Sequence, residues 1–326
     1  MKLKIVVAVL ITGWSYFGSS TALGLQVHTI SRISGNDFLS VFDDSGTRAG
    51  SSTIPSTGAF ASLTTDNDRI FITSSDGGIN QFDLEGDLLG GFANVSSSAD
   101  PLMSSARQIL ESDALGNVYT TFTGFQSTPR TSFRLAPDGS TSASFAHPDL
   151  VFPVGIDADS NGNVFILNSA LDGDRLFQFD ESGSYIDDFA VPGVTRPSDI
   201  AINEVTNELF IGDLGAIRVY DLTSDGPLLV GSLQAARNLD VNDVFVEPSA
   251  ERILGVTFDI FNENNVGFEV SREGELVNTF AVTAGQQNLG VSAIAVISDN
   301  PISVPEPTAT GLLLIAAISL VAVRVR

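Results

Sequence analysis

Cysteine is absent from this 326-residue chain, and histidine occurs only as His28 and His147. Without cysteine, the chain can form no disulfide, thiolate nucleophile or cysteine-ligated metal site. The two histidines lie far apart in sequence, so we do not expect a histidine-based catalytic pair. The motifs G-x-S-x-G and H-E-x-x-H and a phosphate-binding loop are also missing. The common hydrolase and nucleotide-binding signatures are therefore excluded.

Basic residues are scarce as well, because 16 Lys and Arg face 39 Asp and Glu, for a formal net charge of −23. Such a chain repels phosphates, so we expect no nucleic-acid partner. Its acidity favours solubility and would attract Ca²⁺. The single tryptophan, Trp14, lies in the N-terminal apolar segment. Stacking of a sugar on tryptophan is therefore not expected in the rest of the chain.

In place of these features, the chain carries a repeated pattern of short strands, clearest between Pro153 and Phe189. A tight turn is expected at Asn161-Gly162, where glycine tolerates a positive φ, and a polar loop is expected at 169–174. Apolarity falls from the first strand to the last, as in a propeller blade with a buried inner strand and a wet outer edge. The four expected strands are 155–158, 164–167, 176–180 and 184–189.

One motif, a large apolar residue followed by three others and a glycine, recurs after each third strand. It reads FDDSG, FDLEG, LAPDG, FDESG and VSREG, and YDLTSDG with two extra residues. Its glycines lie 40, 53, 44, 43 and 48 residues apart, at Gly46, Gly86, Gly139, Gly183, Gly226 and Gly274. A period in the forties with several strands indicates a propeller. The longest interval contains an insertion, 124–131, where we expect Phe125 to be exposed and both Phe125 and Arg130 to contact a partner.

The two ends of the repeat array complete each other. The last repeat starts with an apolar strand at 291–297 and then stops. The first repeat is also incomplete, since it lacks a first strand and consists of strands at 28–33 and 37–43 and the segment after Gly46. Joined, they make one further period. The sequence therefore predicts an all-β, six-bladed β-propeller over residues 25–299, closed by pairing of N- and C-terminal strands. Closure removes the open sheet edges that would pair between molecules.

The N-terminal segment, 1–24, has the pattern of a secretory signal peptide. Lys2 and Lys4 precede the apolar run 5–11, and small residues near Ala22 suit a signal peptidase. The alternative is a first buried strand. At the other end, residues 300–307 contain three prolines and read as an extended linker.

The C-terminal segment, 308–326, is apolar over 309–323 and ends in basic residues. Fifteen residues of helix span about 22 Å, less than the roughly 30 Å apolar core of a bilayer. The basic end can extend to the surface and should stay cytoplasmic, which leaves the propeller outside. The residues that carry this pattern are Val304, Pro305, Glu306, Pro307, Arg324 and Arg326.

This order of Pro-Glu-Pro, apolar segment and arginines resembles the PEP-CTERM sorting signal of Gram-negative bacteria. The resemblance implies cleavage near Pro-Glu-Pro by an exosortase-like membrane enzyme. The protein would then be anchored only transiently in the inner membrane and would finish at the outer surface or outside the cell. The alternative is a plain C-terminal anchor that is not cleaved.

The blades also resemble the NHL-repeat and SMP-30/gluconolactonase group of six-bladed propellers. The likeness lies in Pro153-x-Gly155-Ile156-Asp157 with its following strands, and in the similar segment 197–213. In the lactonases of this group, an Asn or Asp directly after such a proline binds a divalent metal. Here Val154 and Ser198 fill those positions, and Asp199 stands one place later.

Two sets of polar residues are candidate sites. Asp157, Asp159 and Asn161 match the opening of a calcium loop, D-x-[DN]-x-[DN]-G, although Asn168 replaces the bidentate Glu and no helices flank it. The alternative is an ordinary hairpin turn. The second set is expected at the channel mouth, because its members precede first strands or end second strands. It comprises Arg107, Asn168, Asp199, Asp213 and Asp243, which could bind a cation or sugar, or cap loops.

Two functions remain open. The first is a non-catalytic exported propeller that binds surface polysaccharide or protein, as a scaffold at the cell surface or in extracellular matrix. The second is a divalent-metal-dependent lactonase or hydrolase of the SMP-30 type. The absence of catalytic motifs favours the first, with Ca²⁺ as the one cofactor left open. Convergence of the acidic candidates within reach of one metal ion would favour the second.

Overall fold

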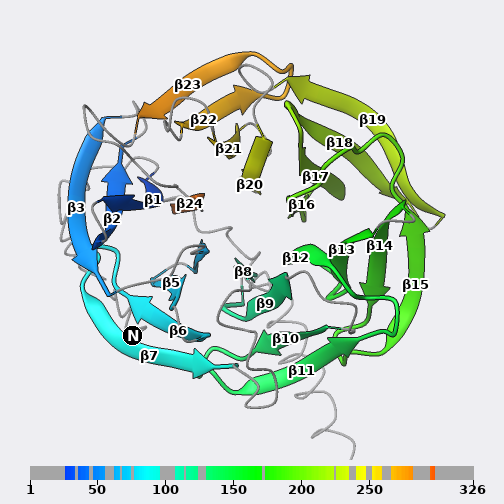
Figure 1. The fold of residues 1–326 in the computed structure, drawn as a ribbon, viewed down its shortest axis with the longest axis horizontal. Coiled ribbons are helices and arrows are strands. Elements are labelled where there is room, and N and C mark those ends of the chain that lie inside the picture. Colours follow the sequence, from blue (N-terminus) through cyan, green and yellow to red (C-terminus); the bar gives the residue numbers. More distant parts are fainter. Residues whose placement is uncertain are drawn as a thin grey trace, which may run out of the picture.

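The computed structural model describes residues 26–297 apart from 34–35, 44–46, 56–61, 67, 75–76, 96–106, 114, 124–129, 171–172, 224, 235–239, 247–251, 259–265 and 282–293. Its strands form six antiparallel four-stranded sheets arranged as a ring (Figure 1). The predicted all-β, six-bladed propeller is therefore confirmed. The expected signal peptide, linker and sorting segment lie outside the described residues. Within the described part, no helix is long and apolar enough to cross a membrane.

Blade 1 joins the two ends of the chain. Its order is β24 (Ile294–Ile297), β1 (Gln26–Ile33), β2 (Asn36–Phe42) and β3 (Arg48–Ile54). β24 pairs antiparallel with β1, from Gln26 opposite Ile297 to Thr29 opposite Ile294. The predicted closure by N- and C-terminal strands is therefore confirmed.

The other five blades each use four consecutive strands, with the first strand nearest the centre of the ring and the fourth at the rim (Figure 1). Blades 2 and 3 are β4 (Leu63–Thr65), β5 (Ile70–Thr73), β6 (Gly78–Phe82), β7 (Leu88–Asn94), β8 (Arg107–Ser112), β9 (Val118–Thr123), β10 (Thr131–Leu135) and β11 (Thr141–Ala146). Blade 4 is β12 (Pro153–Ala158), β13 (Val164–Ala170), β14 (Gly173–Phe179) and β15 (Tyr185–Ala190). Blades 5 and 6 are β16 (Asp199–Asn203), β17 (Glu208–Asp213), β18 (Ala216–Thr223), β19 (Gly226–Gln234), β20 (Asp240–Val246), β21 (Arg252–Phe258), β22 (Val266–Ser271) and β23 (Leu276–Ala281).

Burial falls from the inner strands to the rim, as the sequence predicts. All six residues of β17 are buried, whereas no residue of β15 is. The apolar clusters lie between blades, and one of them packs Leu167 and Leu176 of blade 4 against Ile200 and Ile211 of blade 5. A sheet with an apolar face must bury it against a neighbour, and in this ring the neighbour is the next blade.

The polar loop expected at 169–174 is shorter than predicted. β13 continues to Ala170 and β14 begins at Gly173, with Ser169 opposite Asp174 in the ladder. Ser and Asp are weak strand formers, but here the ladder to the neighbouring strand determines their conformation.

The recurring apolar-to-glycine motif marks a β-bulge. In every blade, the register between the third and fourth strands shifts at the apolar residue of the motif. Each of these residues is at most 1% exposed, and they are Phe42, Phe82, Leu135, Phe179, Tyr220 and Val270. A bulge increases strand twist. It therefore turns the outer strand while the apolar side chain stays in the core.

The glycine of the motif lies against the preceding blade. A Cβ on Gly139 would meet the carbonyl oxygen of Phe92 in β7 at 2.0 Å, and one on Gly183 would meet that of Ser144 in β11 at 2.2 Å. Both glycines have positive φ, 82° and 93°. The motif therefore serves both the turn and the packing between blades.

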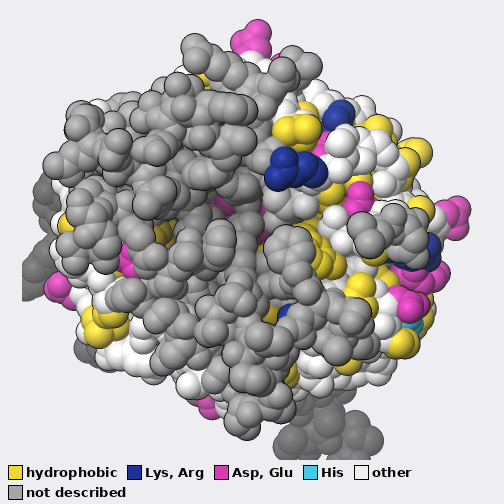
Figure 2. Space-filling model, viewed as in Figure 1, with side chains coloured by type: hydrophobic (Ala, Val, Ile, Leu, Met, Phe, Trp, Pro, Cys, Tyr) yellow, Lys and Arg dark blue, Asp and Glu magenta, His cyan; other side chains and the backbone are white. Residues whose placement is uncertain are grey.

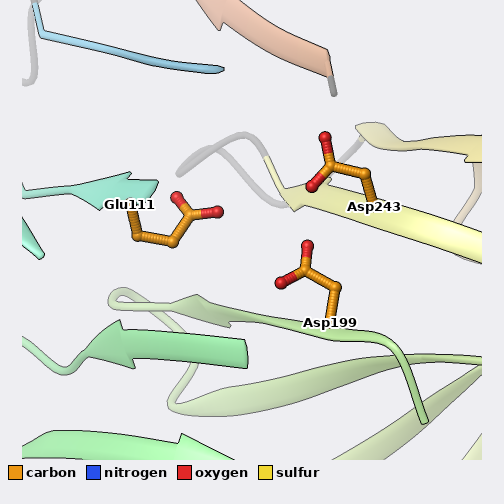
Figure 3. Close-up of side chains that lie close together, drawn as sticks. All are labelled: Glu111, Asp199 and Asp243. Carbon is orange, nitrogen blue, oxygen red and sulfur yellow. The ribbon is translucent and has the colours of Figure 1, made fainter. Parts of the chain in front are cut away.

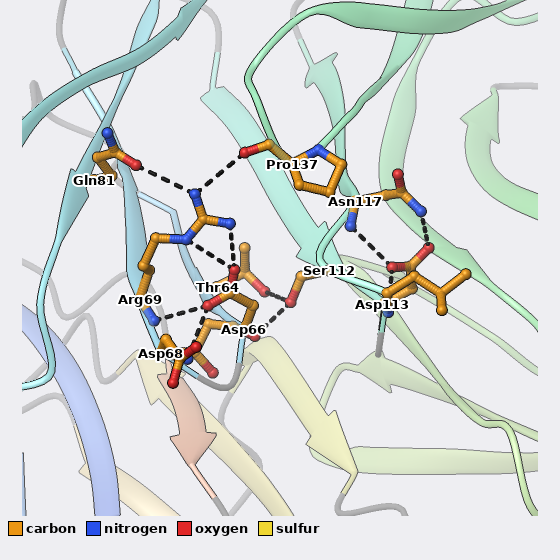
Figure 4. Close-up of polar contacts among 11 residues, drawn as sticks. Thr64, Asp66, Asp68, Arg69, Gln81, Ser112, Asp113, Asn117 and Pro137 are labelled. Atoms are coloured by element: carbon orange, nitrogen blue, oxygen red, sulfur yellow. Dashed lines mark hydrogen bonds and ion pairs between the residues drawn. The ribbon is translucent and has the colours of Figure 1, made fainter. Parts of the chain in front are cut away.

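Polar contacts also tie neighbouring blades together. Figure 4 shows the guanidinium of Arg69 in blade 2, which donates to the Asp66 carboxylate at 2.7 and 3.0 Å and to the carbonyl of Pro137 in blade 3 at 3.2 Å. Nearby, the hydroxyls of Thr64 and Ser112 lie 2.8 Å apart across the same junction.

Candidate functional site

Acidic side chains on inner strands of three blades converge at the centre of the ring. Glu111 of β8, Asp199 of β16 and Asp243 of β20 each place one carboxylate oxygen within 4.8 Å of the others, and their side chains point toward one another (Figure 3). Asp199 is fully buried, Asp243 is 4% exposed and Glu111 is half-buried. We call these three residues the central carboxylate group.

The negative charges of this group repel one another. Burial raises the pKa of Glu111 well above its ordinary value, and the carboxylates of Asp157, Asp199 and Asp243 raise it further. Only the backbone N–H of Ser112 acts in the opposite direction. Such a site favours either protonation or a bound cation.

Two further carboxylates extend the acidic region toward the hairpin turns. Burial raises the pKa of Asp157, and the carboxylates of Glu204 and Asp199 raise it further. Hydrogen bonds from the backbone N–H groups of Ile202 and Ala158 act in the opposite direction. Burial also raises the pKa of Glu204, with added repulsion from Asp113 and Asp159. Carboxylates therefore repel one another from the centre of the ring to the hairpin turns of blades 3 to 5.

The geometry of the central carboxylate group suits a hard divalent cation. Calcium–oxygen distances are about 2.3–2.6 Å, so two oxygens on opposite sides of one Ca²⁺ lie about 5 Å apart or less. The 4.8 Å limit of the group falls within that span. Three carboxylates with no His or Cys are the donor set of Ca²⁺, Mg²⁺ or Mn²⁺ rather than of Zn²⁺.

Of the five residues expected at the channel mouth, the structure brings together Asp199 and Asp243. Both were expected just before first strands, but Asp199 is the first residue of β16 and Asp243 lies within β20. Arg107 is the first residue of β8, and its side chain lies outside the described residues.

Asn168 and Asp213 serve their own loops instead. The Asn168 side chain accepts from the backbone N–H of Phe152 at 2.7 Å and donates to the carbonyl of Asp149 at 3.2 Å. The Asp213 carboxylate accepts from the backbone N–H groups of Thr195 and Arg196 at 2.9 and 2.7 Å. These are the loop-capping contacts that formed the alternative for this set.

The three residues of the calcium-loop pattern have divergent contacts. One oxygen of Asp159 accepts from the backbone N–H groups of Asn161 and Asn163 at 2.9 and 2.8 Å, as in an Asx turn. Asp157 instead accepts from the backbone N–H of Ile202 in blade 5 at 2.6 Å. Gly162 has φ 82°, as the predicted tight turn requires. The contacts of Asp159 are those of the hairpin-turn alternative.

The two contact residues expected in the inserted loop, Phe125 and Arg130, have different outcomes. Phe125 lies outside the described residues, as do the residues of the sorting motif. Arg130 is only 5% exposed, and its backbone N–H donates to the carbonyl of Leu150 at 2.7 Å. This corrects the expectation for Arg130, because a buried guanidinium cannot serve as an exposed contact. Elsewhere on the surface, exposed acidic side chains gather along the edge of blade 4, beside β15 (Figure 2).

Glu111 is the site residue that the sequence analysis missed. It stands two residues before the turn residue Asp113, as Asp157 stands two residues before Asp159. Both turn residues accept backbone N–H groups of their own hairpins. Aligning the blades on these turns would have shown Glu111 and Asp157 as equivalent. A motif search does not detect such a carboxylate, because its neighbours are apolar.

Comparison with known proteins gives a likeness of structure alone. No family model matches the chain, and no curated protein sequence matches it. A chain in the crystal structure of a nidogen/laminin complex matches with a TM-score of 0.61 and 12% identity, over 84% of this chain and 98% of that one. Luciferin-regenerating enzyme matches with a TM-score of 0.52 and 13% identity, over 68% and 80%. At such identities the likeness extends to the fold, a six-bladed β-propeller.

Proposed function

We propose that this protein is an exported binding module whose propeller holds a divalent cation, with Ca²⁺ as the best fit, in its central carboxylate group. The observation that carries the proposal is the convergence of Glu111, Asp199 and Asp243 from three blades. A cation there would offset the repulsion that raises the pKa of Glu111. It would also tie blades 3, 5 and 6 together at their innermost strands.

Export is the second part of the proposal, and its support is the sequence of the two ends. The signal-peptide pattern and the Pro-Glu-Pro tail support a location at the cell surface or in extracellular matrix, after cleavage by an exosortase-like enzyme. Surface polysaccharide or protein is the partner class that such a location offers. Intact mass of the released protein tests this part. We expect it to lack residues 1–22 and those well beyond Pro307, and a released form that retains Arg326 would overturn it.

A metal-dependent hydrolase is the second candidate, because the same three carboxylates would hold a catalytic metal. The likeness to luciferin-regenerating enzyme shows that an enzyme can be built on this fold, although fold alone does not transfer activity. His28 is fully buried, which removes it as a solvent-accessible general base, and His147 stacks on Tyr185 of the rim strand β15, outside the central carboxylate group. A hydrolase here would therefore depend on metal-bound water and one of the carboxylates.

Calorimetric titration with Ca²⁺, Mn²⁺ and Zn²⁺, followed by thermal melting, tests the cation site. At a hundredfold excess over Kd, a single bound ion should stabilise the fold by about 2.7 kcal/mol. Asp199→Asn and Asp243→Asn should abolish binding, because they remove charge while retaining an oxygen acceptor. Glu181→Gln is the matched control, since the Glu181 side chain is 74% exposed. Absence of binding by the unmodified protein would overturn the proposal.

Assays on lactones with each metal separate the two candidates. We expect no turnover. Hydrolysis that disappears in Asp199→Asn and Asp243→Asn but persists in Glu181→Gln would establish the hydrolase instead.

A further inference from the structure

A second candidate site lies away from the centre, in a cleft of about 180 Å³ between blades 4 and 5. Its walls come from the three outer strands of blade 4 and from the ends of β18 and β19 in blade 5, with Asp159 from the β12–β13 hairpin and Asn207 from the β16–β17 hairpin. None of the central carboxylate group contributes to it. Ligand pockets for drug-sized molecules are about 300–1,000 Å³, so this cleft is of a size for a single small ring.

The apolar side of the cleft consists of Phe165, Phe189, Leu222 and Pro227. The ring of Phe189 is held against the backbone of the next blade, because a Cβ on Gly226 would meet it at 2.6 Å. Phe165 is 5% exposed and packed in the core between the blades. The apolar wall is therefore fixed in position before any ligand arrives, which lowers the entropic cost of binding.

The polar side offers amide groups with unused hydrogen-bonding capacity. Asn207 donates through Nδ2 to the carbonyl of Leu222 at 2.7 Å, which fixes its orientation and leaves Oδ1 as an acceptor. Gln178 lies opposite Phe165 in the ladder, and its side-chain amide has no hydrogen bond to any described residue. Together they present one fixed acceptor and an amide with both a donor and an acceptor.

The charge of the cleft limits the class of ligand. Its one carboxylate, on Asp159, already accepts two backbone N–H groups and the Nδ2 of Asn163 at 2.7 Å. A cation would therefore gain little there, and an anion would be repelled by Asp159 and by the net charge of −23. A neutral ligand with hydroxyls on one edge and an apolar face fits both walls.

We propose that this cleft binds a neutral pyranose, either as a free sugar or as one residue of a polysaccharide. The C–H face of the ring would lie on Phe189, Leu222 and Pro227, and its hydroxyls would bond to Gln178 and Asn207. The inference deepens the proposed binding role by naming a ligand class, but it uses none of the residues of the cation site.

Saturation-transfer NMR on the released protein tests the proposal with four free sugars: glucose, galactose, mannose and N-acetylglucosamine. Cellotriose and chitotriose form the polymer arm. We expect millimolar binding of at least one probe, tighter for a trimer if the source is a polysaccharide. Gln178→Ala and Asn207→Gly should each weaken it about tenfold, the effect of one lost hydrogen bond. The glycine is chosen because Asn207 has φ 56°.

Gln81→Ala is the matched control, since Gln81 occupies the equivalent place opposite Phe71 in blade 2. It should leave binding unchanged, and so should Asp199→Asn, which separates this site from the cation site. Melting curves of the variants confirm that they fold. The proposal is overturned if none of the six probes binds at about 10 mM, or if folded Gln178→Ala and Asn207→Gly bind as well as the unmodified protein.

Discussion

The carboxylate of Asp199 in blade 5 accepts a hydrogen bond at 3.0 Å from the backbone N–H of Val244 in blade 6. Asp157 in blade 4 makes the same contact with Ile202 in blade 5, again 45 residues ahead. The hydroxyl of Ser62 beside blade 2 accepts from Leu110 in blade 3 at 3.0 Å. These bonds connect inner strands that share no sheet ladder. The acidic residues of the centre therefore link blades as well as forming the proposed cation site.

The link through Asp157 gives the first prediction. Asp157→Ala should destabilise the fold by about 1–3 kcal/mol, because it leaves the backbone N–H of Ile202 buried without an acceptor. Asp157→Asn should cost less, since its side-chain oxygen can still accept from Ile202 while the buried charge is removed. Urea unfolding of the two variants measures the difference. Equal loss in both would show that the charge of Asp157, and not its acceptor, stabilises the junction.

The motif glycines give the second prediction. Gly139→Ala should destabilise the fold by several kcal/mol, because the new Cβ would overlap the carbonyl of Phe92 and the residue has φ 82°. Gly91→Ala is the control, since Gly91 lies in a strand of the same blade junction with no atom within 4 Å of an added Cβ. Thermal melting compares the two. Similar melting temperatures would mean that the turn can move outward without loss of packing between the blades.

The same motif shows how far sequence reasoning succeeded. The glycine spacing predicted the number of blades, because each blade needs one positive-φ turn at the same place. The strand ends near residues 169–174 were missed, since Ser169 and Asp174 are weak strand formers whose pairing is decided by the ladder. Local propensity does not contain that information.

The candidate site was less accessible to sequence reasoning. Asp199 and Asp243 were expected together because both lie near the start of first strands. Glu111 was missed, since it lies near the opposite end of β8, and only the packing of three blades brings it to the other two. The position of each side chain along the propeller axis depends on how the inner strands of neighbouring blades are shifted relative to one another. The sequence of a single blade does not determine that shift.

Histidine 28 gives the third prediction, on the dependence of stability on pH. Burial lowers the pKa of His28 from 6.5 to about 4, so the unfolded chain takes up a proton at this residue before the folded protein does. Its contribution to stability is therefore complete above pH 6.5 and is lost as the pH falls toward 4, by about 3 kcal/mol in total. The acidic residues with raised pKa act in the opposite direction, because the folded protein binds their protons first.

The effect of His28 is isolated by comparing His28→Gln with the unmodified protein in urea melts from pH 7.5 to 4.5. The variant should lose less stability over that range, whatever its stability at pH 7.5. His147→Gln serves as the control, because the His147 side chain is partly exposed at 22%. Parallel pH profiles of His28→Gln and the unmodified protein would contradict the prediction.

The closure of the ring gives the last prediction. β24 pairs with β1 and also lies beside β4 of blade 2 and β20 of blade 6, so it is the inner strand on which both neighbouring blades pack. A chain of residues 25–290 lacks this strand and exposes the inner edge of β1, where Val27 is fully buried in the complete fold. Such an open edge is prone to pair between molecules. We expect the 25–290 chain to aggregate or to melt well below the 25–299 chain, as measured by size-exclusion chromatography and calorimetry. Equal solubility and melting temperature would mean that the other five blades hold the ring without the closing strand.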